Sequence, residues 1–157
     1  MRREVPGICL RTTLMVGFPG ETQAQFEELV EFVREVKFER MGAFAYCEEE
    51  GTYAAKHYTD DIPQEVKDSR LDILMEAQEE IANQWAENQI GKTYRVIIDR
   101  LEGEYYVGRT EYDSPEVDCE VLIHRNSADL QLGQFYNARI TDAEVFDFFA
   151  EVVNEEV

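Results

Sequence analysis

Residues 11–22 read RTTLMVGFPGET, an apolar run that ends in a turn rich in glycine and proline and leads into an amphipathic segment. The run Leu14–Val16 is too short and too abruptly ended to be a helix, so it indicates a buried strand. Thr22 and Gln25 have the spacing of a capping box, which predicts that a helix begins here. The stretch therefore predicts a strand, a tight turn and a helix, which together form one βα unit.

The predicted helix covers Phe26–Val36, and its apolar residues recur at helical spacing: Phe26, Leu29, Val30 and Val33. In parallel α/β folds, ligands bind at the carboxyl ends of the strands, which is where Gly17–Glu21 would lie. A phosphate site is rejected, because the loop lacks the Walker and dinucleotide glycine patterns and Glu21 is negatively charged. That carboxylate suits an amine or a ribose hydroxyl. The alternative from the residues alone is a plain tight turn, with Glu21 stabilising the helix N-terminus.

Composition limits the class of protein. A length of 157 residues allows one ordinary domain or two small ones, and 44% hydrophobic residues are enough to build a core. The sequence has no long apolar stretch and no signal-peptide pattern, so a cytoplasmic location is expected. The cysteines, Cys9, Cys47 and Cys119, form no C-x-x-C pair. We therefore assign no metal ligand and expect each thiol to be a bystander or a small buried residue.

The formal net charge is −19 and is divided between both halves of the chain. Residues 91–157 hold fifteen Asp and Glu against six Lys and Arg, and residues 1–90 hold nineteen against nine. Such a surface repels nucleic acid and attracts basic proteins, and no membrane partner is expected. The alternative is an acidic surface that serves only solubility.

The rest of the chain divides into a helical part and a β-rich part. A second short strand is expected at Met41–Tyr46, and a long helix is expected to follow Pro63 and to end at Ile90-Gly91. From Thr93 the apolar period changes from helical to two. Further short strands are expected at Tyr105–Glu111, Cys119–His124, Phe135–Ile140 and Val145–Ala150. Five short strands in about sixty residues indicate a small closed barrel, because closure removes exposed edges.

We expect two domains, residues 1–90 and residues 91–157. One βα unit with a single further strand cannot complete a parallel sheet, so residues 1–90 are interpreted as the last part of a larger α/β domain. The chain is therefore expected to be a C-terminal fragment of a longer protein. Exposed strand edges make self-association of such a fragment a reasonable expectation.

Two strings in the first part, LRTTLMVGFPGET and GAFAYCEEEGTYAA, resemble the late part of the radical S-adenosylmethionine barrel in methylthiotransferases. The resemblance implies that Leu10–Gly17 and Ala43–Tyr46 are late strands of an open (β/α) barrel. The cofactor-binding residues that it implies are Gly17, Phe18, Pro19, Gly20 and Glu21. In the family the second loop commonly reads S-P-E-E-G-T, and Cys47 and Glu48 depart from that pattern.

The resemblance also implies cofactors in the full-length parent: S-adenosylmethionine and two [4Fe–4S] clusters. This chemistry needs a C-x-x-x-C-x-x-C motif, which the chain lacks. We therefore assign no catalytic residue to the chain and expect the fragment alone to be inactive. In the parent, a deoxyadenosyl radical would abstract hydrogen and sulfur would then be inserted.

Residues Gly91–Val152 resemble a TRAM domain, a small OB-like barrel at the C-terminus of methylthiotransferases. We expect its five strands to be antiparallel. The string YYVGRTEYDSPEVD, with its G-R-T and P-E-V-D runs, resembles the RimO type, which modifies an aspartate of a small-subunit ribosomal protein. The implied partner is a basic ribosomal protein, and the predicted docking residues are Arg109, Asp113, Glu116 and Asp118.

The residues of this loop support protein docking independently of the resemblance. Several carboxylates together form a poor binding site for phosphates and a good one for Lys and Arg side chains. Arg109 either contacts a substrate carboxylate or pairs internally with Asp113 or Glu111. The rival within the family is a tRNA methylthiotransferase with an RNA-binding barrel, which would need a basic face. A second rival is an acidic binding module with no enzymatic role.

Overall fold

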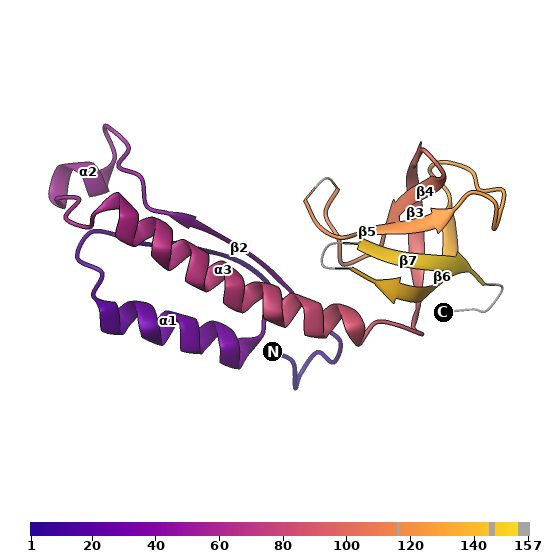
Figure 1. The fold of residues 1–157 in the computed structure, drawn as a ribbon, viewed down its shortest axis with the longest axis horizontal. Helices are drawn as coiled ribbons and strands as arrows, with labels where there is room; N and C mark the ends of the chain where they lie inside the picture. The colour runs from indigo at the N-terminus through magenta and orange to yellow at the C-terminus, as the bar shows by residue number, and fades with distance from the viewer. Residues whose placement is uncertain (116, 145–146, 154–157) are drawn as a thin grey trace. The chain divides into compact units, whose positions relative to one another are not determined.

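The computed structural model describes residues 1–115, 117–144 and 147–153. The chain divides into two compact units, Met1–Ala82 and Asn83–Val157, which are described separately (Figure 1). Within the described ranges, no helix combines the length and the apolar composition that crossing a membrane requires.

The first unit begins with the predicted βα unit. Strand β1 (Arg11–Val16) leads through the glycine-rich turn into helix α1 (Gln23–Val36), and β2 (Arg40–Ala45) then pairs with β1 in parallel. The capping box is formed in full: the Thr22 side chain accepts from the Gln25 amide, and the Gln25 side chain accepts from the Thr22 amide. The strand, turn and helix predicted from the sequence are confirmed.

Helix α2 (Tyr53–His57) and helix α3 (Gln64–Glu87) follow β2. The single turn of α2 was not predicted; it is capped by the Thr52 hydroxyl, which accepts from the Ala55 amide. Helix α3 begins after Pro63 as predicted but ends at Glu87, three residues before the predicted end.

The core of the first unit lies between one face of the sheet and the two long helices. Its buried residues come from β1, α1 and α3: Val16, Phe26, Val30, Val33, Leu74, Ala77 and Ile81. On the opposite face of the sheet, Met15 and Phe44, which are paired in register, are 40% and 47% exposed. Among the described residues the sheet has two strands, so the predicted radical S-adenosylmethionine barrel is not visible in this chain.

The second unit is a closed five-stranded barrel, which confirms that part of the predicted fold (Figure 1). Its strands are β3 (Thr93–Glu102), β4 (Tyr105–Arg109), β5 (Glu120–His124), β6 (Phe135–Ala143) and β7 (Asp147–Val152). The prediction of an antiparallel barrel was wrong at one pair, because β5 and β7 run parallel. The long connection between β5 and β6 allows β7, rather than β6, to lie beside β5. Residues 145–146 of the predicted last strand lie outside the described residues.

The barrel interior is filled by alternate residues of its strands, including Val96, Ile98, Val121, Ile123 and Phe148. The ring of Trp85 packs against Phe148 with the ring centroids 5.9 Å apart. At Gly108 the neighbouring strand approaches so closely that a Cβ atom would lie 2.4 Å from the carbonyl oxygen of Ile97. The glycine of the G-R-T run is therefore required by strand packing.

Candidate functional sites

The Gly17–Glu21 loop connects β1 to α1 at the carboxyl end of the two-stranded sheet. Gly17 and Gly20 have φ values of 72° and 80°, a conformation that glycine adopts without strain. The amide of Glu21 donates to the carbonyl oxygen of Phe18 over 2.9 Å, which closes the turn. The amide of Gly17 donates to Oε1 of Glu21 over 3.1 Å. The Glu21 side chain therefore folds back onto the start of its own loop.

Glu21 also forms an ion pair with helix α3. Its Oε1 lies 2.7 Å from Nη1 of Arg70, and the two side chains are only 14% and 8% exposed. The same arginine nitrogen donates to the backbone carbonyl oxygen of Glu21 over 3.2 Å. The guanidinium also lies 5.5 Å from the centroid of the Phe26 ring. The carboxylate is thus neutralised inside the unit, a partnership that the sequence analysis missed because the residues are 49 positions apart.

A second buried cation, Lys67, packs beneath the same loop. Its Nζ pairs with Oδ2 of Asp60, donates to the carbonyl oxygen of Tyr46 over 3.3 Å and lies 5.2 Å from the Tyr46 ring centroid. The methylene stem of Lys67 occupies the space beside Gly17, where a Cβ atom would come within 2.5 Å of Lys67 Cγ. Gly17 therefore needs to be glycine both for its φ and for this contact.

An apolar pocket of about 410 Å³ lies beside the loop, and its walls come from the ends of β1 and β2 and from α2. Its lining residues are Met15, Phe18, Phe44, Ala45, Tyr46, Cys47, Glu49, Thr52 and Ala54. The Phe18 ring meets the Tyr46 ring edge to face at 5.2 Å. Burial, together with the charge of Glu48, raises the pKa of the Tyr46 hydroxyl. Of the five loop residues predicted to bind a cofactor, only Phe18 lines this pocket.

The remaining loop residues have different surroundings. Gly20 is exposed, and its amide donates to Oδ1 of Asp61 over 2.9 Å, while Pro19 is half-buried between Phe18 and Gly20. In the part of the chain that the structure describes, no group of three or more His, Cys, Asp or Glu side chains is placed to hold a metal ion.

The second candidate site follows β4 in the barrel and contains the predicted docking residues. The Asp113 side chain is buried and accepts from the Thr110 hydroxyl over 2.5 Å and from the Thr110 amide over 3.3 Å. The Asp118 side chain is half-buried and accepts from the Ser114 amide over 2.6 Å. Asp113 is therefore an internal residue that shapes the loop. Glu116 lies outside the described residues.

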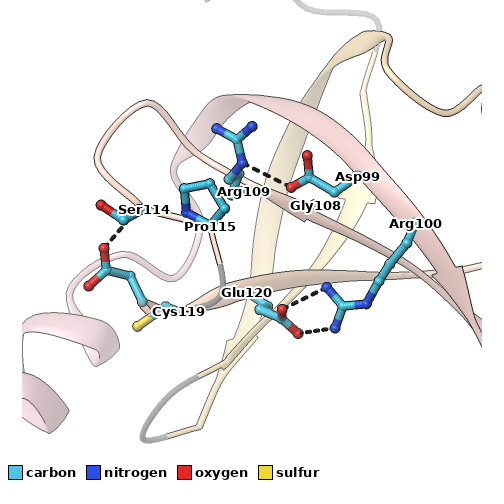
Figure 2. A pocket seen from close by; sticks show the side chains of 9 residues that line it. Asp99, Arg100, Gly108, Arg109, Ser114, Pro115, Cys119 and Glu120 are labelled. Carbon is cyan, nitrogen blue, oxygen red and sulfur yellow. Dashed lines mark hydrogen bonds and ion pairs between the residues drawn. The ribbon is translucent and has the colours of Figure 1, made fainter.

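Arg109 pairs with a residue that the sequence analysis did not consider. Its Nε lies 3.0 Å from Oδ2 of Asp99 on the neighbouring strand β3, a different residue from the Asp113 and Glu111 that the sequence suggested. Figure 2 shows this ion pair, with the two terminal nitrogens of Arg109 pointing away from Asp99. Because a cross-strand pair depends on register, the spacing within one loop could not reveal it.

A pocket of about 260 Å³ lies beside Arg109 and is lined by residues of β3, β4, β5 and the loop: Asp99, Arg100, Gly108, Arg109, Ser114, Pro115, Asp118, Cys119 and Glu120. On its wall Arg100 forms two hydrogen bonds with Glu120, of 2.8 and 2.9 Å (Figure 2). These bonds and a third to Glu102 raise the pKa of Arg100. The structure thus brings Arg109 and Asp118 to one pocket and turns Asp113 inward.

Comparison with known proteins identifies the barrel. Residues 90–153 match the TRAM domain family, so the closed barrel is a TRAM domain. The chain is 61% identical over 154 residues to the ribosomal protein uS12 methylthiotransferase RimO of Bacteroides thetaiotaomicron, and 61% identical over 152 residues to that of Phocaeicola vulgatus. It is 57% identical over 155 residues to that of Porphyromonas gingivalis. The resemblance to RimO-type methylthiotransferases is therefore confirmed.

These matches cover 97–98% of the chain but only 35–36% of the relatives, so the chain spans about a third of their length. A solved multidomain protein with nucleic acid binding domains from Streptococcus pneumoniae aligns with a TM-score of 0.35 and 19% sequence identity. That alignment covers 45% of this chain and 25% of the other.

Proposed function

We propose that this chain is part of an enzyme that β-methylthiolates an aspartate of the small-subunit ribosomal protein uS12. The observation that carries the proposal is 61% identity, over 98% of the chain, to a ribosomal protein uS12 methylthiotransferase. The chain lacks the C-x-x-x-C-x-x-C motif, so we infer that it supplies part of the barrel wall and the docking domain, and that it is inactive alone.

For residues 1–90 we propose the last βα units of an open radical S-adenosylmethionine barrel together with the linking helix. Two features support this. The strands β1 and β2 are parallel and joined by a helix, as in (β/α) barrels, and Met15 and Phe44 on one face of the sheet are partly exposed. The rest of such a barrel would cover these side chains. Residues 91–157 are the TRAM part of the proposed arrangement.

We propose that S-adenosylmethionine binds near Gly17–Glu21. The apolar pocket beside Phe18 and Tyr46 has walls suited to an aromatic ring, which fits the adenine of this cofactor. The carboxylate of Glu21 fits the cofactor's amine less well, because Arg70 and the Gly17 amide already bind its Oε1. We therefore assign Glu21 to shaping the loop and Phe18 to contacting the ligand. When bound, the cofactor would supply the radical that abstracts hydrogen, with two [4Fe–4S] clusters held by other residues of the parent.

We propose that the pocket of the TRAM domain docks the basic substrate protein. Asp118 and the region of Glu116 contribute negative charge, Asp113 shapes the loop, and Arg109 presents its terminal nitrogens to a carboxylate of the partner. The net formal charge of residues 91–157 is −9, from fifteen acidic and six basic residues, which favours a basic partner over RNA.

The proposal is tested by titrating the 157-residue chain against purified uS12 and, separately, against a tRNA anticodon stem-loop, each across a salt series. We expect binding to uS12 that weakens as salt rises, and no binding to the RNA. Asp118→Lys is expected to weaken uS12 binding about tenfold or more, because a repulsive charge replaces an attractive one.

The matched control is Asp142→Lys, the same change at an exposed position on β6 outside the pocket. Equal losses for both variants would show that overall charge, rather than this pocket, binds the partner. RNA binding without uS12 binding would overturn the proposal in favour of a tRNA methylthiotransferase.

A further inference from the structure

Two cationic side chains that the proposed reaction does not use lie in the first turns of α3. Lys67 and Arg70 are three residues apart, and they are only 2% and 7% exposed. Residues at this spacing lie on the same face of a helix. Here that face carries both cations to the Gly17–Glu21 loop.

Arg70 controls the start of the loop through one shared oxygen atom. Oε1 of Glu21 accepts from Nη1 of Arg70 over 2.7 Å and from the amide of Gly17 over 3.1 Å. The amide of Gly17 is therefore bonded to a side chain whose position Arg70 determines. Without Arg70, the Glu21 carboxylate would turn toward water, because a buried unpaired charge is costly.

Lys67 acts on the far side of the loop through two consecutive residues, Asp60 and Asp61. Its Nζ pairs with Asp60, and the next residue, Asp61, accepts from the amide of Gly20 over 2.9 Å. The segment that holds Gly20 is thus anchored to α3 by Lys67. The two cations act on two separate amides of the same loop.

A need for stability alone does not explain why Lys67 and Arg70 form buried ion pairs here. Buried ion pairs contribute little net stability, because desolvation of the charges offsets their attraction. Within the described residues, Oδ1 of Asp60 and Nε of Arg70 are buried and have no hydrogen-bond partner. Apolar side chains of similar volume would avoid these costs. What the ion pairs supply is position. Arg70 holds the Glu21 carboxylate that binds the Gly17 amide, and Lys67 holds Asp60, the neighbour of the Asp61 carboxylate that binds the Gly20 amide.

We propose that Lys67 and Arg70 are positioning residues that hold the Gly17–Glu21 loop in the conformation that receives its ligand. The assignment of S-adenosylmethionine as that ligand rests on the proposed function. The two cations themselves touch no ligand in this scheme. They act through Glu21, through the Asp60-Asp61 segment and through the packing of the Lys67 stem beside Gly17.

The test follows the two loop amides by NMR in Arg70→Met and Lys67→Met variants of the 157-residue chain. Arg70→Met is expected to raise the hydrogen-exchange rate of the buried Gly17 amide about ten- to one-hundred-fold, as loss of a charged hydrogen-bond partner implies. Lys67→Met is expected to shift the Gly20 amide resonance and to leave Gly17 exchange within about twofold. Arg70→Lys is expected to restore most of the protection of Gly17.

The matched control is Arg34→Met, which removes an exposed cation from α1 and is expected to change neither amide. A uniform rise in the amide hydrogen-exchange rates of α1 and the sheet in Arg70→Met and Lys67→Met would overturn the inference. It would mean that the cations only stabilise the first unit. Unchanged Gly17 exchange in Arg70→Met would overturn it as well.

Calorimetric titration of the same variants with S-adenosylmethionine separates this inference from the proposed function. If the chain binds the cofactor, we expect about tenfold weaker binding in Arg70→Met and recovery in Arg70→Lys. Equal affinity for S-adenosylmethionine in Arg70→Met, Arg70→Lys and the unaltered 157-residue chain would overturn the positioning role. Absence of binding by the unaltered chain would count against the assigned ligand, while the amide measurements would still decide whether the loop is positioned from α3.

Discussion

Oε1 of Glu21 lies 2.7 Å from Nη1 of Arg70, and the two side chains are 14% and 8% exposed. This ion pair joins the loop after β1 to a helix that begins 43 residues after Glu21, at Gln64. It changes the interpretation of Glu21, which the sequence suggests as a ligand for an amine or as a favourable charge at a helix N-terminus.

Glu21→Ala is expected to destabilise the first unit by about 3 kcal/mol, because it leaves the buried Arg70 guanidinium without its carboxylate. Urea unfolding followed by far-UV circular dichroism measures the effect. Adding Arg70→Met to the Glu21→Ala chain should recover part of the loss, because the unpaired charge is then removed. Glu28→Ala, at an exposed position on α1, is the control and should cost less than about 0.5 kcal/mol. An equal loss from Glu28→Ala would contradict the prediction.

Thr110→Val is expected to destabilise the barrel by about 1–3 kcal/mol, because the buried Asp113 carboxylate loses the hydroxyl that donates to it. The single Trp85, which packs on Phe148, reports barrel unfolding by its fluorescence. Thr141→Val removes an exposed hydroxyl that donates to the Phe149 carbonyl oxygen, and it should cost less because water can replace that bond. Equal costs for the two variants would show that Asp113 does not depend on Thr110.

Gly108→Ala is expected to destabilise the barrel by about 2 kcal/mol or more, since the new Cβ atom would lie 2.4 Å from the Ile97 carbonyl oxygen. Thermal unfolding monitored by circular dichroism gives the measurement. The same substitution at Gly42, where nothing lies within 4 Å of the added Cβ, should be nearly neutral. A neutral Gly108→Ala would mean that β3 and β4 separate at little cost.

Asp147→Asn is expected to stabilise the barrel slightly at pH 7. Burial raises the pKa of Asp147 above its unfolded value of 3.8, so the folded state binds more protons than the unfolded state in that range. The favourable contribution of Asp147 to the free energy of unfolding is therefore complete below pH 3.8. It is lost as the pH rises through the pKa of Asp147 in the folded state. Urea midpoints from Trp85 fluorescence should favour the Asn variant at pH 7 and lose that difference at pH 3. A difference that persists at pH 3 would point to a cause other than ionisation.

Local sequence signals predicted the elements well. The capping pair Thr22 and Gln25 located the start of α1, and the change of period at Thr93 located the start of β3. Both signals act between residues close in the chain, which is why they could be interpreted without a structure. The single turn of α2 was missed, because five residues carry too little periodicity to distinguish a helix from a loop.

The candidate sites were only partly predictable. The motifs located the Gly17–Glu21 loop and the loop after β4, but the partners of their charged residues come from distant positions. Arg70 pairs with Glu21, and Asp99 pairs with Arg109, through packing and strand register. No spacing within either loop contains that information.

The sequence by itself determined the strand, turn and helix after Arg11, the small barrel and the acidic surface. These follow from local periodicity, capping, turn residues and composition. Only the tertiary structure decided that Asp113 faces inward, that β5 lies parallel to β7, and that α3 holds the Gly17–Glu21 loop through buried cations. The physical reason is that burial, strand pairing and ion pairing depend on which distant residues meet, and that is settled only when the chain packs.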